Sequence, residues 1–91
     1  MNQQTNEVIN RRFEEQNQRC LKAVEWLLRR HIAVARASIS LEHVHIHLAH
    51  KPNCDLKNTQ VILREGSRKG EVLHLSAPLN GCEIRWKESL H

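Results

Sequence analysis

The sequence has few aromatic residues and few cysteines, and both shortages narrow the possible classes of protein. Its 91 residues include two Trp, one Phe and no Tyr, so aliphatic side chains must build most of the core. The three cysteines are widely spaced and form no CxxC pair, which fits neither a disulfide framework nor a zinc finger. Free thiols in a reducing compartment are the simpler interpretation, and we expect a cytoplasmic protein.

Long apolar runs and catalytic motifs are also missing. No segment approaches the roughly 18–20 apolar residues that cross a bilayer, and the polar start MNQQTNEV lacks the apolar core of a signal peptide. We therefore expect no membrane contact. The sequence contains no GxSxG, no HExxH and no GxxxxGK[ST] phosphate loop. We expect a protein that is not an enzyme and that has no cofactor and no bound metal ion.

The length and the charge indicate a small basic domain. We expect residues 1–6 to be a disordered N-terminus and residues 7–91 to form one domain. Such a small domain has a thin stability margin, which a partner or self-association would increase. Lys and Arg number 14 against 10 Asp and Glu, and the formal charge of +4 suits an anionic partner.

Residues 7 to about 33 are predicted to form one long helix, because no Gly or Pro interrupts them and Thr5 or Asn6 can cap the start. Steps of about 100° per residue place the predicted core residues on one helix face. They are Ile9, Phe13, Cys20, Val24, Leu27 and His31. We expect His31 to be a packed or capping residue.

Residues 36–50 are predicted to form a strand with one irregularity. Ile39 and Leu41 share one side of the alternation, whereas Val44, Ile46 and Leu48 share the other. The change near Glu42 indicates either a bulge or the true start of the strand. Residues 51–58 then form a loop, with Pro52 and Asn53 as turn residues.

The C-terminal part is predicted to contain two hairpins that share one apolar face. Asn80-Gly81 is a strong hairpin signal and pairs Leu79 with Cys82, Ala77 with Ile84, and Leu75 with Trp86. A second turn at GSRKG, residues 66–70, pairs Glu65 with Glu71, Leu63 with Leu73, and Val61 with Leu75. The two turns agree on one face. We therefore predict an α+β fold in which the long N-terminal helix packs on a four-stranded antiparallel β-meander.

The helix face opposite the core stripe is the stronger candidate for a binding surface. Its predicted partner-binding residues are Arg12, Arg19, Lys22, Trp26, Arg29 and Arg30. An exposed Trp among arginines is typical of an interface hot spot. The alternative is that a neighbouring strand or loop covers Trp26 and that the charges are merely solvated.

A secondary basic surface is predicted on the sheet face that the helix leaves open. Its residues are His43, His45, His47, Arg64, Arg68, Lys69, Arg85 and Lys87. The segment EHVHIHLAH, residues 42–50, is the most unusual part of it. A solvated strand face is the first interpretation of these histidines, and contact with a polyanion is the second. A zinc site is the least favoured, because His74 is expected to be too distant and only Cys54 and Asp55 of the following loop could approach.

These patterns favour a non-catalytic binding protein. We expect a small inhibitor or adaptor, similar in type to those of phages and mobile elements, that docks on a nucleic-acid-handling protein or a ribonucleoprotein complex. Three alternatives remain open at this point. They are direct electrostatic binding of nucleic acid, a structural homodimer and a histidine-based zinc protein.

Overall fold

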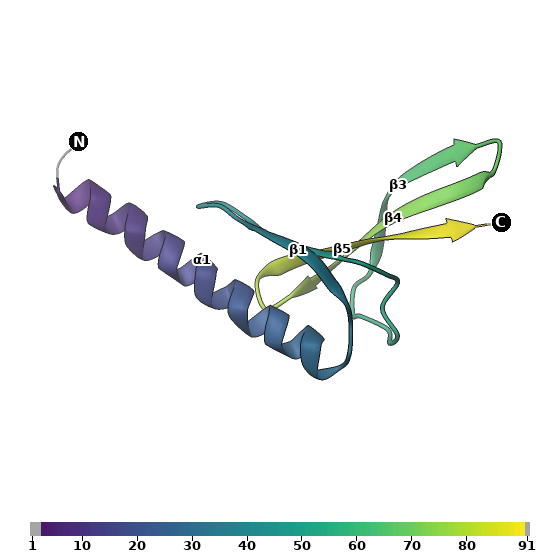
Figure 1. Cartoon of the computed structure of the whole chain (residues 1–91). Helices are drawn as coiled ribbons and strands as arrows, with labels where there is room; N and C mark the ends of the chain where they lie inside the picture. The colour runs from purple at the N-terminus through teal and green to yellow at the C-terminus, as the bar shows by residue number, and fades with distance from the viewer. Residues whose placement is uncertain (1–2, 91) are drawn as a thin grey trace.

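The fold is α+β, as predicted, with one long helix followed by five strands (Figure 1). The computed structural model describes residues 3–90, so Met1, Asn2 and His91 lie outside the described residues. The helix α1 spans Gln3–Arg29. The strands are β1 (Val34–Ile39), β2 (Val44–Leu48), β3 (Gln60–Ser67), β4 (Gly70–Leu79) and β5 (Cys82–Leu90).

The sheet order is β1-β2-β5-β4-β3, and β2 pairs with β5 in parallel. The prediction of a four-stranded, purely antiparallel meander is therefore wrong in strand number and in one pairing. The extra strand comes from a turn within residues 36–48. There the Ser40 amide donates to the His43 carbonyl at 2.9 Å, and the Ser40 hydroxyl caps the same turn. The change in alternation thus marks a turn between two strands.

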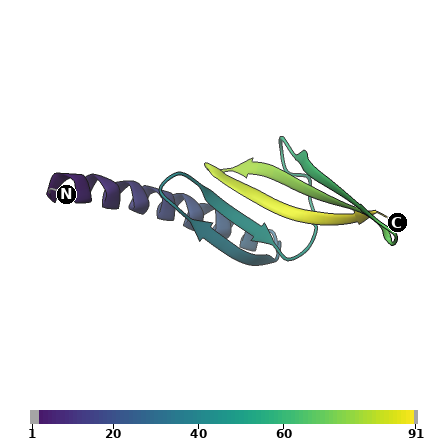
Figure 2. The same cartoon turned by 90° about the horizontal axis from the view of Figure 1, so that it is seen from above.

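The loop of residues 49–59 explains the parallel pairing. It carries the chain from β2 to the far edge of the sheet, so β3 does not lie beside β2 (Figure 2). The antiparallel meander β3-β4-β5 then returns, and β5 takes the place next to β2. Leu56 of the loop packs against the core, so the loop shares the helix side of the sheet.

The β4–β5 hairpin has the predicted register. Leu79 pairs with Cys82, Ala77 with Ile84, and Leu75 with Trp86. Asn80 and Gly81 have φ angles of 50° and 77°, which are the two positive values of a type I′ turn. Trp86 is buried in the core, as predicted.

The β3–β4 hairpin has the predicted register only at its first pair, Val61 with Leu75. A bulge at Ile62 shifts the pairing of the later residues, so Arg64 pairs with Leu73. The tighter turn places Arg68 and Lys69 between Ser67 and Gly70. The bulge moves the side chains that follow it in β3 to the other sheet face. The predicted pairs Leu63–Leu73 and Glu65–Glu71 are therefore wrong.

The helix begins and ends earlier than predicted. It starts at Gln3, so neither Thr5 nor Asn6 is its cap. At the other end, the His31 amide donates to Leu28 and the Ile32 amide to Leu27, which is the Schellman pattern. His31 is exposed with a φ of 58°, so it is a capping residue and not a core residue.

The core covers only the second half of the helix. Gln16, Cys20, Ala23 and Leu27 are buried against the sheet. The first half projects beyond the sheet (Figure 1), and Ile9 and Phe13 of the predicted core stripe are 37% and 44% exposed. The predicted core stripe has the correct periodicity, but only its second half is buried against the sheet.

Candidate functional site

One face of the sheet has no helix or loop over it, and we call it the open sheet face. Its residues alternate with the buried Val44, Ile46 and Leu48 of β2, and the strand register assigns the others. They are Arg36, Ser38, His43, His45, His47, Leu63, Glu65, Val72, His74, Ser76, Glu83, Arg85 and Lys87. Basic and potentially basic side chains outnumber the two carboxylates.

Three of these side chains form a row across neighbouring strands. Arg36 of β1 pairs with His47 of β2, and His47 pairs with Arg85 of β5. Neighbouring strands lie about 4.8 Å apart, so the three groups stand side by side. Among residues 3–90, no carboxylate forms an ion pair with Arg36. The row therefore carries uncompensated positive charge.

A hollow of about 470 Å³ is lined by all three side chains of this row. Its basic and potentially basic lining residues are Arg36, His47, His74, Arg85 and Lys87, which come from four different strands. The other lining residues are apolar, and no described carboxylate is among them. A hollow with this lining suits a negatively charged group.

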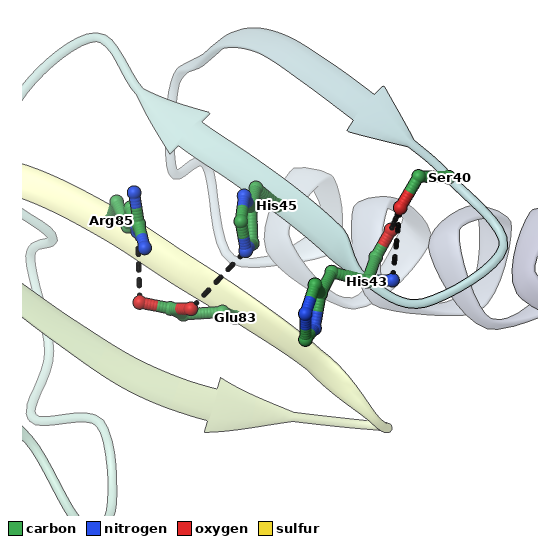
Figure 3. Close-up of polar contacts among 5 residues, drawn as sticks. All are labelled: Ser40, His43, His45, Glu83 and Arg85. Carbon is green, nitrogen blue, oxygen red and sulfur yellow. Dashed lines mark hydrogen bonds and ion pairs between the residues drawn. The ribbon is translucent and has the colours of Figure 1, made fainter.

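The two carboxylates of the open sheet face are held by its own basic groups. Glu83 accepts a hydrogen bond from Arg85 Nε at 2.8 Å and lies 3.3 Å from His45 Nε2 (Figure 3). The bond from Arg85 is the main cause that lowers the pKa of Glu83. Glu65 lies 2.7 Å from His74 Nε2. Neither carboxylate is left to offset Arg36.

Burial lowers the pKa of His47, and the positive charges of Arg36 and Arg85 lower it further. Near neutral pH the imidazole is therefore mostly uncharged and can accept as well as donate a hydrogen bond. A bound anion would offset the two arginines and favour protonation of the ring.

The histidines of β2 do not form a metal site in the described residues. The rings of His43 and His45 stack at 5.6 Å with an interplanar angle of 14° (Figure 3). No group of three or more His, Cys, Asp or Glu side chains in residues 3–90 could hold a metal ion. The stacked pair instead lines a second hollow together with Glu42 and Glu83.

Two residues of the predicted helix surface contact their own chain. Arg12 Nε donates to the Leu41 carbonyl at 3.1 Å and so holds the β1–β2 turn. Arg19 donates to Gln16 at 3.0 Å, and its side chain lies against Gly81, where an added Cβ would come within 3.1 Å of it. These arginines position the two turns at one end of the sheet.

Trp26, the proposed anchor of the helix surface, is half-buried. It packs against the core, and the Arg30 guanidinium lies 3.6 Å from its ring centroid. Lys22 and Arg29 are exposed. The helix surface is therefore less open than its sequence pattern indicates, although its role in binding stays a prediction.

The residues of the predicted secondary basic surface do not all lie on the open sheet face. Because of the bulge at Ile62, Arg64 lies on the helix side of the sheet and pairs with Glu71 at 3.7 Å. Arg68 and Lys69 lie at the β3–β4 turn. Arg36 and His74 join the site although they were not among its predicted residues. Treating residues 40–43 as a turn would have placed Arg36 beside His47.

Comparison with known proteins gives no relative: no family model, no curated protein and no solved structure matches this chain. Within the described residues, no helix has the length and apolar character to cross a membrane. The function must therefore be argued from the site itself.

Proposed function

We propose that this chain is a non-catalytic binding protein of the inhibitor or adaptor kind. It docks on a nucleic-acid-handling protein or a ribonucleoprotein complex through its open sheet face, in the cytoplasm. The observation that carries the proposal is the row Arg36–His47–Arg85 on a sheet face that the rest of the described chain leaves uncovered. Surfaces with one sign of charge attract partners of the other sign and increase association rates.

The proposal moves the contact from the helix to the sheet. Arg12 and Arg19 are engaged with the turns of their own chain, and Arg30 covers Trp26. The cations of the open sheet face that have no carboxylate partner within residues 3–90, Arg36 and Lys87, are both exposed. The sheet face is thus the better supported of the two basic surfaces.

The experiment is affinity capture from an extract of the source organism with two matched charge-reversal variants. Arg36→Glu/Lys87→Glu alters the open sheet face, and Arg11→Glu/Arg29→Glu alters exposed helix positions by the same charge. We expect wild type and the helix variant to retain the same protein or complex, and the sheet variant to lose it. Capture that survives in the sheet variant and fails in the helix variant would contradict the proposal.

A structural homodimer is the second candidate, and the projecting half of α1 favours it. Ile9 and Phe13 are 37% and 44% exposed there, although they continue the apolar side of the helix. Light scattering coupled to gel filtration tests this candidate. A dimer mass that Phe13→Asp reduces to the monomer mass would support it, and a wild-type monomer at all concentrations would exclude it.

A further inference from the structure

The hollow on the open sheet face has the lining of a phosphate site. Arg36, His47, Arg85 and Lys87 surround it from β1, β2 and β5, and His74 of β4 completes it. Guanidinium groups bind phosphate oxygens bidentately, and an ammonium adds a point charge. No described carboxylate lines the hollow, although Glu83 and Glu65 reach two of its basic residues, Arg85 and His74, from outside it.

The basic and potentially basic side chains are spread over four strands and do not converge on one point. Arg85 and Lys87 are two residues apart on β5, which places them about 6.5–7 Å apart on one face. Such spacing suits an extended polyanion better than a single small ion.

The stacked imidazoles lie farther along the same sheet face, where they line a second hollow together with Glu42 and Glu83. His45 is two residues from His47 on β2 and shares its face, and His43 stacks on His45 at the outer side. His43 is exposed. Exposed aromatic rings beside cations are the elements that bind unpaired bases and the backbone of single-stranded nucleic acid.

We propose that the open sheet face binds single-stranded nucleic acid, with a backbone phosphate in the hollow between Arg36, His47 and Arg85 and with a base on His43. The centre of this face is a row of basic and polar groups, which suits contact with a phosphate backbone. The inference rests on the proposed function, because it assigns the contact to the nucleic-acid component of the partner.

The test is an anisotropy titration with labelled single-stranded RNA and DNA of roughly 12 nucleotides. We expect binding whose affinity falls steeply between 50 and 200 mM salt. Arg36→Ala is expected to weaken it about tenfold, because it removes a phosphate contact. Arg11→Ala removes the same charge from an exposed helix position outside both predicted surfaces and is the matched control. Circular dichroism checks that each variant is folded.

Further probes distinguish single-stranded nucleic acid from other anions that could bind the same residues. His43→Ala should weaken oligonucleotide binding without changing the response of His47 to inorganic phosphate, followed by nuclear magnetic resonance. Equal affinity for a duplex, for poly-glutamate or for inorganic phosphate alone would overturn the inference. So would oligonucleotide binding that Arg36→Ala leaves intact.

The two proposals can fail separately. If no oligonucleotide binds while the extract experiment still depends on Arg36 and Lys87, the partner's protein component makes the contact and only the present inference is wrong. If neither experiment depends on these residues, the proposed function is wrong as well.

Discussion

His31 occupies a backbone conformation that favours glycine. Its φ of 58° closes the Schellman motif after α1, and its side chain is exposed. A residue with a Cβ pays about 1 kcal/mol or more in this conformation. His31→Gly is therefore expected to raise the free energy of unfolding by up to about 1 kcal/mol, after the greater freedom of glycine in the unfolded chain is subtracted.

Urea denaturation checks this prediction. His50→Gly is the control, because His50 is also exposed but does not have a positive φ. A gain in His50→Gly equal to that in His31→Gly would show that backbone conformation is not the cause.

His47 should titrate below the ordinary histidine value of about 6.5. Burial is the main cause of the lowered pKa, Arg36, Arg85 and His45 lower it further, and Glu83 opposes them. The folded state then binds fewer protons at His47 than the unfolded chain. Its contribution to stability is present above about pH 6.5 and is lost as the pH falls through the folded pKa.

Arg36→Ala is expected to raise the pKa of His47 and to reduce this loss of stability at acidic pH. Nuclear magnetic resonance titration of the imidazole measures the first effect, and urea denaturation at several pH values measures the second. Arg11→Ala, on the helix, should leave both unchanged. If Arg36→Ala left the pKa of His47 unchanged, the charge of Arg36 would not be a cause of the lowered pKa.

At the scale of elements, the two halves of α1 should differ in their contribution to stability. Leu27 is buried in the core, whereas Phe13 is 44% exposed on the projecting half. Leu27→Ala is expected to lower the free energy of unfolding by about 2–5 kcal/mol. Phe13→Ala should change it by about 0.5 kcal/mol or less. Urea denaturation at low protein concentration compares the two, and similar losses would mean that the projecting half is not independent of the core.

The elements that the sequence predicts well are those with local signals. Asn80-Gly81 determines the β4–β5 register, and the absence of Gly and Pro predicts the helix. The turn at residues 40–43 contains Ser40 but no Gly, Pro or Asn, so it resembled an irregular strand. The bulge at Ile62 has no Gly to mark it. The pairing of β2 with β5 depends on contacts between distant segments, which periodicity does not encode.

The residues of the candidate site were also predictable only in part. His43, His45, His47, Arg85 and Lys87 lie on the open sheet face, because strand alternation determines the face of each residue. The alternation could not place Arg64, since the bulge precedes it. On the helix, periodicity identifies the face of Arg12 and Arg19. It does not reveal that the turns at Leu41 and Gly81 will contact them.

At the scale of the whole molecule, the chain is elongated. Its radius of gyration is 15.9 Å over the Cα atoms and its longest extent is 55 Å, whereas a globular domain of this length has a radius of about 12 Å. Both the projecting half of α1 and the β3–β4 hairpin extend away from the core (Figure 1). The molecule therefore has two protruding arms on opposite sides of one small core.

Removing residues 1–10 should leave the core intact. The buried helix residues begin at Gln16, and Arg12 keeps its bond to the Leu41 carbonyl. We expect the truncated chain to retain its sheet signal in circular dichroism and to have a smaller radius of gyration in small-angle X-ray scattering. Loss of the sheet signal would show that the projecting half contributes to folding of the core.

The position of β5 has a consequence for how the protein is made. It lies in the middle of the sheet, between β2 and β4, yet it comes after the other strands in the chain. During translation α1, β1 and β2 can assemble early, and β3 with β4 can form a hairpin, but nothing joins them. Until β5 leaves the ribosome, β2 and β4 each present an unpaired edge, which is the kind of surface that chaperones bind and that aggregates. The five-stranded sheet can therefore be complete only after β5 has been synthesised.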